Sequence, residues 1–158
     1  MKIWFRKIES GDKKYFSKWW RDKDILKLTS GNLKLISDKK LEKYFSTMLG
    51  SKIDFDYLIF ASKKAIGHMA LRKRRLGWYE FQIAIGEKSY WGKGYGTKAL
   101  KLLIKKTKSK NIYLEVRPDN LRAIRSYEKC GFKAVGLKKY PKNKYQPVTL
   151  KMVYENRT

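Results

Sequence analysis

The chain has 158 residues, of which 42% are hydrophobic and 15% aromatic, so it can build a core and is not expected to be disordered. Its 39 Lys and Arg residues outnumber 14 Asp and Glu residues, and the net charge of +25 is expected to attract polyanions, although a lysine-rich composition is an equally good explanation. The chain has a single cysteine, so it cannot form an internal disulfide. It has no run of 18 apolar residues of the kind that spans a membrane. We therefore expect one domain over residues 1–158 in a soluble, cytoplasmic protein without a membrane partner.

The first 50 residues are predicted to form a strand followed by helices. Residues 3–8 alternate as a strand. Residues 12–26 carry apolar side chains at spacings of three and four, which predicts a helix with one buried face. A second helix is expected from about Asp38, with Ser37 as its N-cap. Four aromatic residues of these helices are expected in the core, with the wall of a binding pocket as the alternative: Trp19, Trp20, Tyr44 and Phe45.

Three strand-like runs follow, at residues 56–62, 65–74 and 78–85, and short turns between them predict an antiparallel meander. The only histidine, His68, falls in the middle of the second run, where we expect a structural role. Residues 97–110 then alternate apolar and lysine side chains as an amphipathic helix.

The C-terminal third is predicted to contain a strand at 111–116, a helix that begins at Asp119 or Asn120 and ends at Gly131, and strands at 132–139 and 148–154. The strand-helix-strand unit over residues 80–116 implies two parallel strands joined by a crossover. The expected fold is therefore an α/β fold with a mixed, mostly antiparallel sheet flanked by helices.

Glycines at 92, 94 and 96 in the segment YWGKGYG stand directly before the predicted helix. A helix start exposes free backbone amides, and glycine permits positive φ and close approach, so this loop is suited to bind phosphate. The spacing fits neither a Walker A loop nor the dinucleotide fingerprint. A tight strand-to-helix turn is the alternative.

A second segment, NLRAIRSYEKCGF, places Asn120, Ala123, Tyr127, Gly131 and Phe132 in register. Together with the glycine loop it resembles the GNAT superfamily of N-acetyltransferases, whose loop follows the pattern Arg/Gln-x-x-Gly-x-Gly/Ala. Trp91 is a departure, since Arg or Gln is commonest in the family. The chain is similar both to ribosomal-protein N-terminal acetyltransferases and to aminoglycoside 6′-N-acetyltransferases.

The resemblance implies a GNAT-like sheet whose parallel strand pair lies at the coenzyme site, and acetyl-CoA as the co-substrate. The loop would bind the coenzyme's pyrophosphate through Trp91, Gly92, Lys93, Gly94, Tyr95, Gly96 and Thr97. The backbone of Ile83, Ala84 and Ile85 would border the pantetheine arm and the thioester. Asn120 would bind the coenzyme, cap its helix, or do both.

For catalysis, the resemblance implies that Tyr127 protonates the departing thiolate. We expect Glu80 to act as the general base, because it lies on the strand beside the thioester. Asp54, Asp56 and Glu87 are further acids, and water chains or direct uptake of a neutral amine would remain if no carboxylate is essential. Cys130 is expected to pack in the core, and no residue spacing indicates a metal site.

The expected function is acetyl transfer from acetyl-CoA to a primary amine in a ternary complex, with a protein or peptide N-terminus as the first acceptor. Aminoglycosides or other small amines are alternatives. Because basic residues cluster in three segments, a non-catalytic module that binds nucleic acid or the ribosome is a hypothesis of another class. The protein is expected to be a monomer or homodimer.

Overall fold

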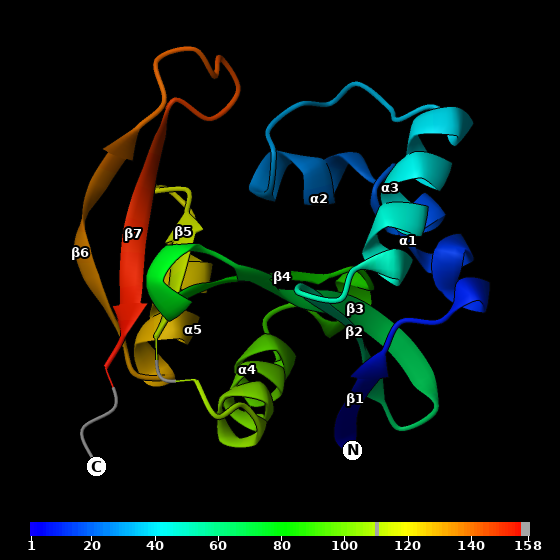
Figure 1. The fold of residues 1–158 in the computed structure, drawn as a ribbon, viewed down its shortest axis with the longest axis horizontal. Helices are drawn as coiled ribbons and strands as arrows, with labels where there is room; N and C mark the ends of the chain where they lie inside the picture. Colours follow the sequence, from blue (N-terminus) through cyan, green and yellow to red (C-terminus); the bar gives the residue numbers. More distant parts are fainter. Residues whose placement is uncertain (110, 156–158) are drawn as a thin grey trace.

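The computed structural model describes residues 1–109 and 111–155. Within these residues, seven strands form one sheet in the order β1-β2-β3-β4-β5-β7-β6 (Figure 1). The strands are β1 (Ile3–Lys7), β2 (Phe55–Ala61), β3 (Lys64–Lys73), β4 (Tyr79–Ile85), β5 (Ile112–Val116), β6 (Phe132–Lys139) and β7 (Val148–Tyr154). Neighbouring strands run antiparallel except for β4 and β5, which are parallel. The expected mixed, mostly antiparallel sheet is confirmed.

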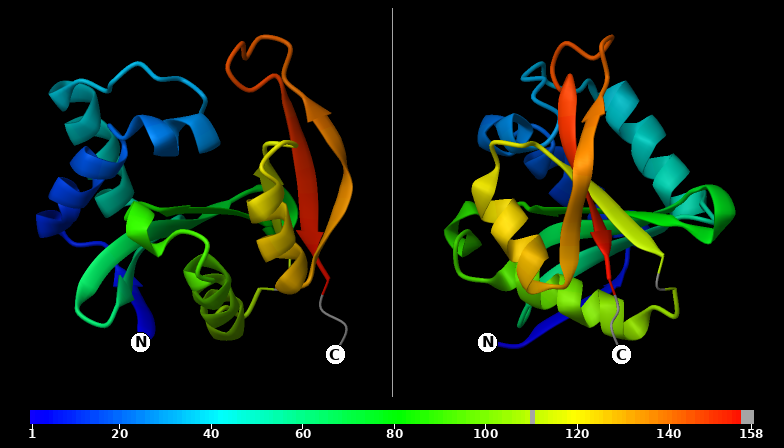
Figure 2. Two further views of the ribbon diagram at one scale, coloured as in Figure 1. Left: turned by 180° about the vertical axis from the view of Figure 1, so that it is seen from behind. Right: turned by 90° about the vertical axis from the view of Figure 1, so that its left-hand side faces the viewer.

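Helices cover both faces of this sheet, as Figure 1 and Figure 2 show. On one face lie α1 (Lys13–Trp19), α2 (Lys23–Leu28) and α3 (Asp38–Gly50), and on the other lie α4 (Tyr95–Lys106) and α5 (Leu121–Lys129). Short 3-10 turns occur at Ser10–Asp12, Arg75–Gly77 and Lys88–Tyr90. Among the described helices, none has the length and apolar character needed to cross a membrane.

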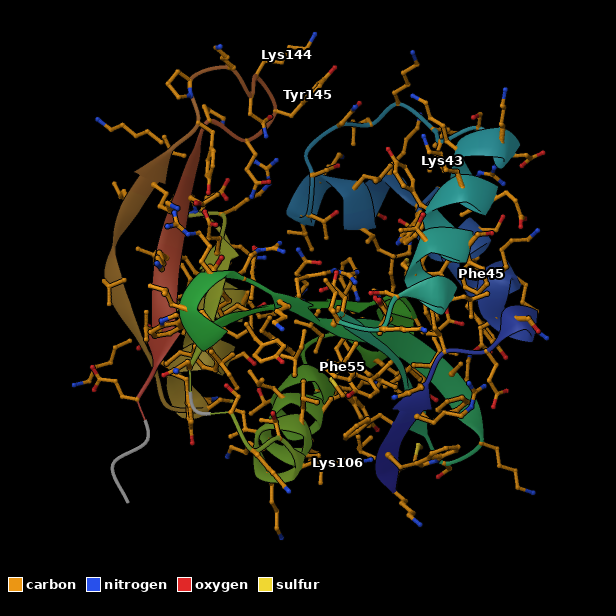
Figure 3. The ribbon with its side chains drawn as sticks, in the orientation of Figure 1. Lys43, Phe45, Phe55, Lys106, Lys144 and Tyr145 are labelled. Atoms are coloured by element: carbon orange, nitrogen blue, oxygen red, sulfur yellow. The ribbon has the colours of Figure 1, made fainter. Side chains whose placement is uncertain are left out.

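The side chains of the strands pack into two hydrophobic cores, one on each face of the sheet, because successive side chains of a strand point to opposite faces. On β2, Leu58 and Phe60 pack with α1–α3, whereas Ile59 packs with α4 and α5. Phe45 of α3 (Figure 3) is 2% exposed, and its ring centroid lies 5.4 Å from that of Phe16. Each such aromatic side chain stabilises the fold by about 1.5–3 kcal/mol through burial.

The helix expected over residues 12–26 is two helices, so this prediction was wrong. The Asp22 carboxylate accepts hydrogen bonds from the backbone N–H groups of Asp24 (2.9 Å) and Ile25 (3.4 Å) and begins α2 as a new helix. Capping bonds of this kind contribute about 1 kcal/mol. The break turns α2 so that its last residue, Leu28, reaches the cavity described below.

The helix expected over residues 97–110 begins two residues earlier, at Tyr95, and ends at Lys106. The predicted end, residue 110, lies outside the described residues. The amphipathic pattern is confirmed, since Ala99, Leu100 and Leu103 are buried against the sheet.

The two parallel strands pair over a short stretch and then separate. Their register joins Tyr79 to Ile112 and Glu80 to Tyr113, and no further pairs of β4 and β5 residues follow in the described chain. Figure 1 shows β5 running away from β4 beyond this point. The second half of β4 therefore pairs with β3 only and keeps one edge open.

Candidate active site

A cavity of about 770 Å³ lies where β4 and β5 separate. Its walls are the second half of β4, the loop and helix start from Tyr90 to Thr97, one side of α5, and the loop between β6 and β7. The end of α2 also lines it. Lys144 and Tyr145 mark the tip of the β6–β7 loop in Figure 3. Segments far apart in sequence thus enclose one space.

Two of the three loop glycines are required by the backbone. Gly92 and Gly94 have φ angles of +72° and +82°, which residues with a side chain rarely adopt. Gly96 is not among the positive-φ residues, and an added Cβ there would meet Ile83 and Ile85 at an ordinary 3.8 Å. The loop shape therefore depends on the first two glycines.

The backbone amides of residues 92–97 donate no hydrogen bond to any other described residue. Gly94 is the N-cap of α4, and the first intrahelical bond comes from Lys98 N–H to the Gly94 carbonyl oxygen (3.0 Å). Free amides at a helix start, together with a helix dipole equivalent to roughly half a positive charge, form an anion site.

Trp91 anchors this loop to the end of β4. Its indole Nε1 donates a hydrogen bond to the Ile85 carbonyl oxygen (2.7 Å), and the guanidinium of Arg122 lies 5.0 Å from the centre of its ring. The departure from Arg or Gln at this position thus has a structural role. Ile85 borders the cavity, but its carbonyl oxygen is already bonded.

Three cations that were not predicted from the sequence line the cavity from α5: Arg122, Arg125 and Lys129. Guanidinium and ammonium groups pair with phosphates, so they extend the anion site formed by the loop amides. Lys93 belongs to the loop but does not line the cavity, so any role predicted for it is limited to its backbone.

The open edge of β4 passes through the cavity. Ile83, Ala84 and Ile85 all line it. On one face of the sheet, Ile83 and Ile85 pack against the core beside α4. On the other face, Ala84 packs against the core beside α1–α3. An extended ligand can bind such an edge through backbone hydrogen bonds, as an added strand would. Strand edge and amide loop together fit a ligand that has a long arm ending in a diphosphate.

Helix α5 brings two predicted residues to the cavity. The Asn120 side chain accepts a hydrogen bond from Ala123 N–H (3.3 Å), so its capping role is confirmed. The Tyr127 ring packs edge-on against Phe81 and Phe132, and its hydroxyl bonds to no other described residue. Burial raises the pKa of Tyr127 well above the ordinary tyrosine value, so the phenol stays protonated.

Glu80, the predicted base, lines the cavity but is held by an arginine. Its Oε1 accepts hydrogen bonds from Nη2 (2.8 Å) and Nε (3.1 Å) of Arg74. Glu80 therefore faces the cavity as one half of an ion pair, held through Oε1.

A second carboxylate in the cavity, Glu115 on β5, was missed by the sequence analysis. Its Oε1 accepts hydrogen bonds from the Tyr140 hydroxyl (2.5 Å) and the Thr149 hydroxyl (2.6 Å). Burial and the bond to Glu115 raise the pKa of Tyr140 to about 12. Oε2 of Glu115 bonds to no described residue and is free to accept from a ligand.

Arg117, which also lines the cavity, connects two segments beside it. Its Nε and Nη2 donate to the backbone carbonyl oxygens of Thr29 (3.1 Å) and Tyr145 (2.7 Å), which joins the end of α2 to the β6–β7 loop. These two segments come from opposite ends of the chain, and no local pattern in the sequence predicts their contact.

The other predicted residues lie outside the cavity or behind its wall. Asp54 accepts from Lys73 N–H (2.8 Å), and Glu87 pairs with Lys18 (2.9 Å). Asp56 is buried behind His68, which does line the cavity. Cys130 is buried, as expected.

The aromatic set of the first helices does not wall the cavity. Trp19 and Phe45 are core residues, as expected, and Trp20 is half-buried. Tyr44 is 52% exposed, so its expected core position was wrong. Among the described residues, no group of three or more His, Cys, Asp or Glu side chains could hold a metal ion.

Comparison with known proteins adds a family model and relatives. The model of the acetyltransferase (GNAT) domain matches residues 2–133. An uncharacterized protein of Mycobacterium leprae is 30% identical over 101 residues, which are 64% of this chain and 27% of that protein. The match therefore spans about a quarter of this relative's length.

Solved structures share the fold. The spermidine N-acetyltransferase of Vibrio cholerae, in complex with CoA and spermine, has a TM-score of 0.76 and 24% identity, with 96% of this chain and 94% of that chain covered. The aminoglycoside acetyltransferase AAC(6′)-Ib, in complex with coenzyme A and kanamycin, has a TM-score of 0.74 and 22% identity, with 96% and 93% covered.

Proposed function

This chain belongs to the GNAT acetyltransferase family, and on that premise we propose that it transfers the acetyl group of acetyl-CoA to a primary amine by direct attack in a ternary complex. One observation carries the proposal: a single cavity joins the free amides of residues 92–97, the open edge of β4 and the hydroxyl of Tyr127. These are a diphosphate site, a strand-like binding edge and a proton donor.

The donor is placed by backbone groups. The diphosphate accepts hydrogen bonds from the amides between Gly92 and Thr97, with Arg122, Arg125 and Lys129 supplying positive charge. The pantetheine arm lies along residues 83–85, so that the thioester sits where β4 and β5 diverge. Asn120 borders the same space and keeps α5 in place through its cap.

Tyr127 assists departure of the thiolate. As the C–S bond breaks, its hydroxyl donates a hydrogen bond to the sulfur. A pKa raised by burial keeps the hydroxyl protonated at every working pH, but it also makes complete transfer of the proton to a thiolate less favourable than for an ordinary tyrosine. Hydrogen-bond donation to the developing charge is therefore its main contribution.

The acceptor class we propose first is the amino terminus of a peptide or protein. A chain of net charge +25 repels polycationic amines in solution and attracts polyanionic assemblies such as the ribosome, which present protein termini beside nucleic acid. The resemblance of the segment YWGKGYG to ribosomal-protein N-terminal acetyltransferases favours the same class.

A small polycationic amine is the second candidate, and Glu115 is the observation that favours it. This carboxylate keeps Oε2 free inside the cavity, where it can accept from an ammonium group. The solved relatives that bind spermine or kanamycin share this fold, although their identity to this chain is below 25%. A non-catalytic nucleic-acid module is the candidate of another class, and it is supported only by the charge.

Two measurements test the proposal. Acetyl-CoA at 100 times its Kd should stabilise the fold by roughly 2.7 kcal/mol and raise the melting temperature. Release of free thiol should then be followed with peptides, polyamines, amino sugars and aminoglycosides as acceptors. Absence of a thermal shift at millimolar acetyl-CoA would contradict donor binding, and RNA binding that persists at physiological salt would favour the non-catalytic module.

A further inference from the structure

The chain's only histidine faces the proposed reaction site from the neighbouring strand. His68 lies in the middle of β3, directly opposite Ala84 of β4, and both line the cavity. Because residues opposite each other in an antiparallel pair share a face, the imidazole lies on the same side of the sheet as the Ala84 side chain. That side chain belongs to the strand segment proposed to carry the thioester.

A buried carboxylate fixes the orientation of the ring. Nε2 of His68 lies 2.7 Å from Oδ1 of Asp56, which is 4% exposed. Arg72 donates to both oxygens of Asp56, from Nη1 to Oδ2 (2.6 Å) and from Nη2 to Oδ1 (2.8 Å). Burial alone would raise the pKa of Asp56, but the bonds from His68 and Arg72 outweigh it and hold the pKa below its usual value.

The ionised carboxylate determines which ring nitrogen carries the proton. A carboxylate only accepts hydrogen bonds, so Nε2 must be the protonated nitrogen. In the neutral ring, Nδ1 is then an acceptor with a free lone pair. An Asp-bonded imidazole with one bare nitrogen is the arrangement that general bases of other enzymes use.

Nδ1 is accessible from the cavity. It bonds to no described residue, and the only fully buried side-chain nitrogen or oxygen without a partner in the described chain is Nε1 of Trp19. The ring packs edge-on against Phe16 of α1, with centroids 4.8 Å apart. Of its neighbours, β2 presents the charged Asp56, which Arg72 of β3 holds in turn, whereas α1 presents Phe16 and β4 presents Ala84.

On the strand that borders the thioester, the carboxylate on the same face as Ala84 is ion-paired. Glu80 is paired with Arg74, and the next side chain on the same face, Gln82, is an amide that cannot take a proton at working pH. Glu115 is engaged by two hydroxyl groups on one oxygen and lies on β5. The carboxylates of Glu80 and Glu115 are each held through Oε1, and Oε2 of each bonds to no described residue, whereas Nδ1, the one acceptor atom of the neutral His68 ring, has no partner at all.

We propose that His68 is the general base of the transfer reaction, with Asp56 and Arg72 as positioning residues. This inference rests on the proposed function. Nδ1 removes a proton from the amine, directly or through one water, as the nitrogen bonds to the thioester carbon. The C–S bond then breaks, and the thiolate leaves stabilised by the hydrogen bond from Tyr127 and takes a proton from solvent to give free coenzyme A. His68 returns its proton to solvent, so the products are the N-acetyl amine and the thiol.

The first test does not require turnover. Because the chain has one histidine, its ¹⁵N ring signals in the wild-type protein belong to His68. Above the pH at which the ring loses its charge, we expect protonated Nε2 and bare Nδ1, with the Nδ1 signal shifting when coenzyme A is added. A ring with protonated Nδ1, or ring signals unaffected by coenzyme A, would overturn the proposal even if no acceptor has been found.

The second test compares pH–rate profiles. In His68→Gln, the side-chain amide can still donate to Asp56, so the fold should be retained while the base is lost. We expect kcat for the amine to fall about 10²- to 10⁴-fold, the acidic limb of the profile to disappear, and the affinity for acetyl-CoA to stay unchanged. Glu80→Gln is the matched variant and should keep the acidic limb.

The outcomes separate this proposal from the proposed function. If Glu80→Gln removes the acidic limb and His68→Gln keeps it, Glu80 is the base and our assignment of His68 is wrong. A lower melting temperature of His68→Gln with an unchanged profile would show a purely structural role for the histidine. A wild-type chain that binds acetyl-CoA but acetylates no amine would contradict the proposed function, whereas the ¹⁵N experiment would still decide the state of His68.

Discussion

The indole of Trp91 donates a 2.7 Å hydrogen bond to the carbonyl oxygen of Ile85, and this bond joins the amide loop to the strand that borders the cavity. The proposed phosphate site and the proposed thioester site are thereby held at a fixed separation. A donor that spans both sites is bound without first ordering the loop, which lowers the entropic cost of binding.

Trp91→Phe should weaken acetyl-CoA binding while leaving the fold intact. Phenylalanine keeps a ring for Arg122 but removes the donor, so the Ile85 carbonyl loses its partner. An unpaired polar group costs about 1–3 kcal/mol, which corresponds to roughly a fivefold rise in Kd at the lower end. Calorimetric titration with acetyl-CoA measures this, and an unchanged Kd would show that the loop needs no anchor.

Gly94→Ala should reduce coenzyme affinity through the backbone. At a φ of +82°, a residue with a Cβ is strained by roughly 1–2 kcal/mol, and the loop relaxes away from the shape that presents its amides. Gly77→Ala is the control, because Gly77 has a φ of +77° in a turn outside the cavity. Both variants should lose stability, and only the first should lose affinity. If Gly94→Ala bound acetyl-CoA as tightly as Gly77→Ala, the proposal that backbone amides bind the diphosphate would be contradicted.

Tyr127→Phe should lower kcat about 10²- to 10³-fold without changing the KM for acetyl-CoA, because the hydroxyl stabilises the charge on the leaving sulfur and does not act on donor binding. Tyr44→Phe removes a hydroxyl from an exposed tyrosine outside the cavity and serves as the control. Steady-state rates of thiol release measure both variants. Unchanged turnover in Tyr127→Phe would remove the tyrosine from the mechanism.

Glu115→Gln should raise the KM for the amine acceptor roughly tenfold and leave the acetyl-CoA affinity unchanged, since the charge that receives an ammonium group is lost. Glu128→Gln removes the same charge from an exposed position of α5 outside the cavity and controls for net charge. Steady-state kinetics give the KM for the amine acceptor in Glu115→Gln and in Glu128→Gln, and a rise in the first variant alone would support an acceptor site at Glu115. A similar rise in both variants would indicate a general electrostatic effect instead of an acceptor site.

Asp56→Asn should change how the free energy of unfolding depends on pH. The pKa of Asp56 is lower in the folded chain than in the unfolded chain, where it is about 4, so its contribution is present above pH 4 and is lost as the pH falls through the folded pKa. The variant should be less stable at pH 7 by about 3–5 kcal/mol and should lose less on acidification.

Asp12→Asn is the matched control for this variant. Asp12 is also buried and bonds to Arg6 at 2.8 and 3.0 Å, and its pKa is lowered as well, because the bonds from Arg6 and the Glu9 backbone outweigh its burial. It lies outside the cavity. Chemical denaturation between pH 3 and pH 8 compares the two, and only Asp56→Asn should also slow acetyl transfer.

The sequence predicted features that depend on neighbours along the chain. Gly92 and Gly94 stand before a helix start, and Asn120 stands three residues before the amide that it caps, so these local geometries follow from residue type and spacing. The pattern of strands was predicted for the same reason. The division between α1 and α2 was missed, although Asp22 is a typical cap, because the aromatic periodicity suggested one continuous helix.

What the sequence by itself determined is the set of elements and the loop that exposes free amides, since both are fixed by interactions within a few residues. The tertiary structure decided which distant side chains meet. Asp56 reaches His68 only in the register of β2 and β3, which shifts at a bulge between Ile59 and Phe60, and a slip of one residue would place the two on opposite faces. Glu115 of β5 meets Thr149 of the neighbouring strand β7 and Tyr140, which follows β6, and such contacts depend on strand order and register, which local propensities do not encode.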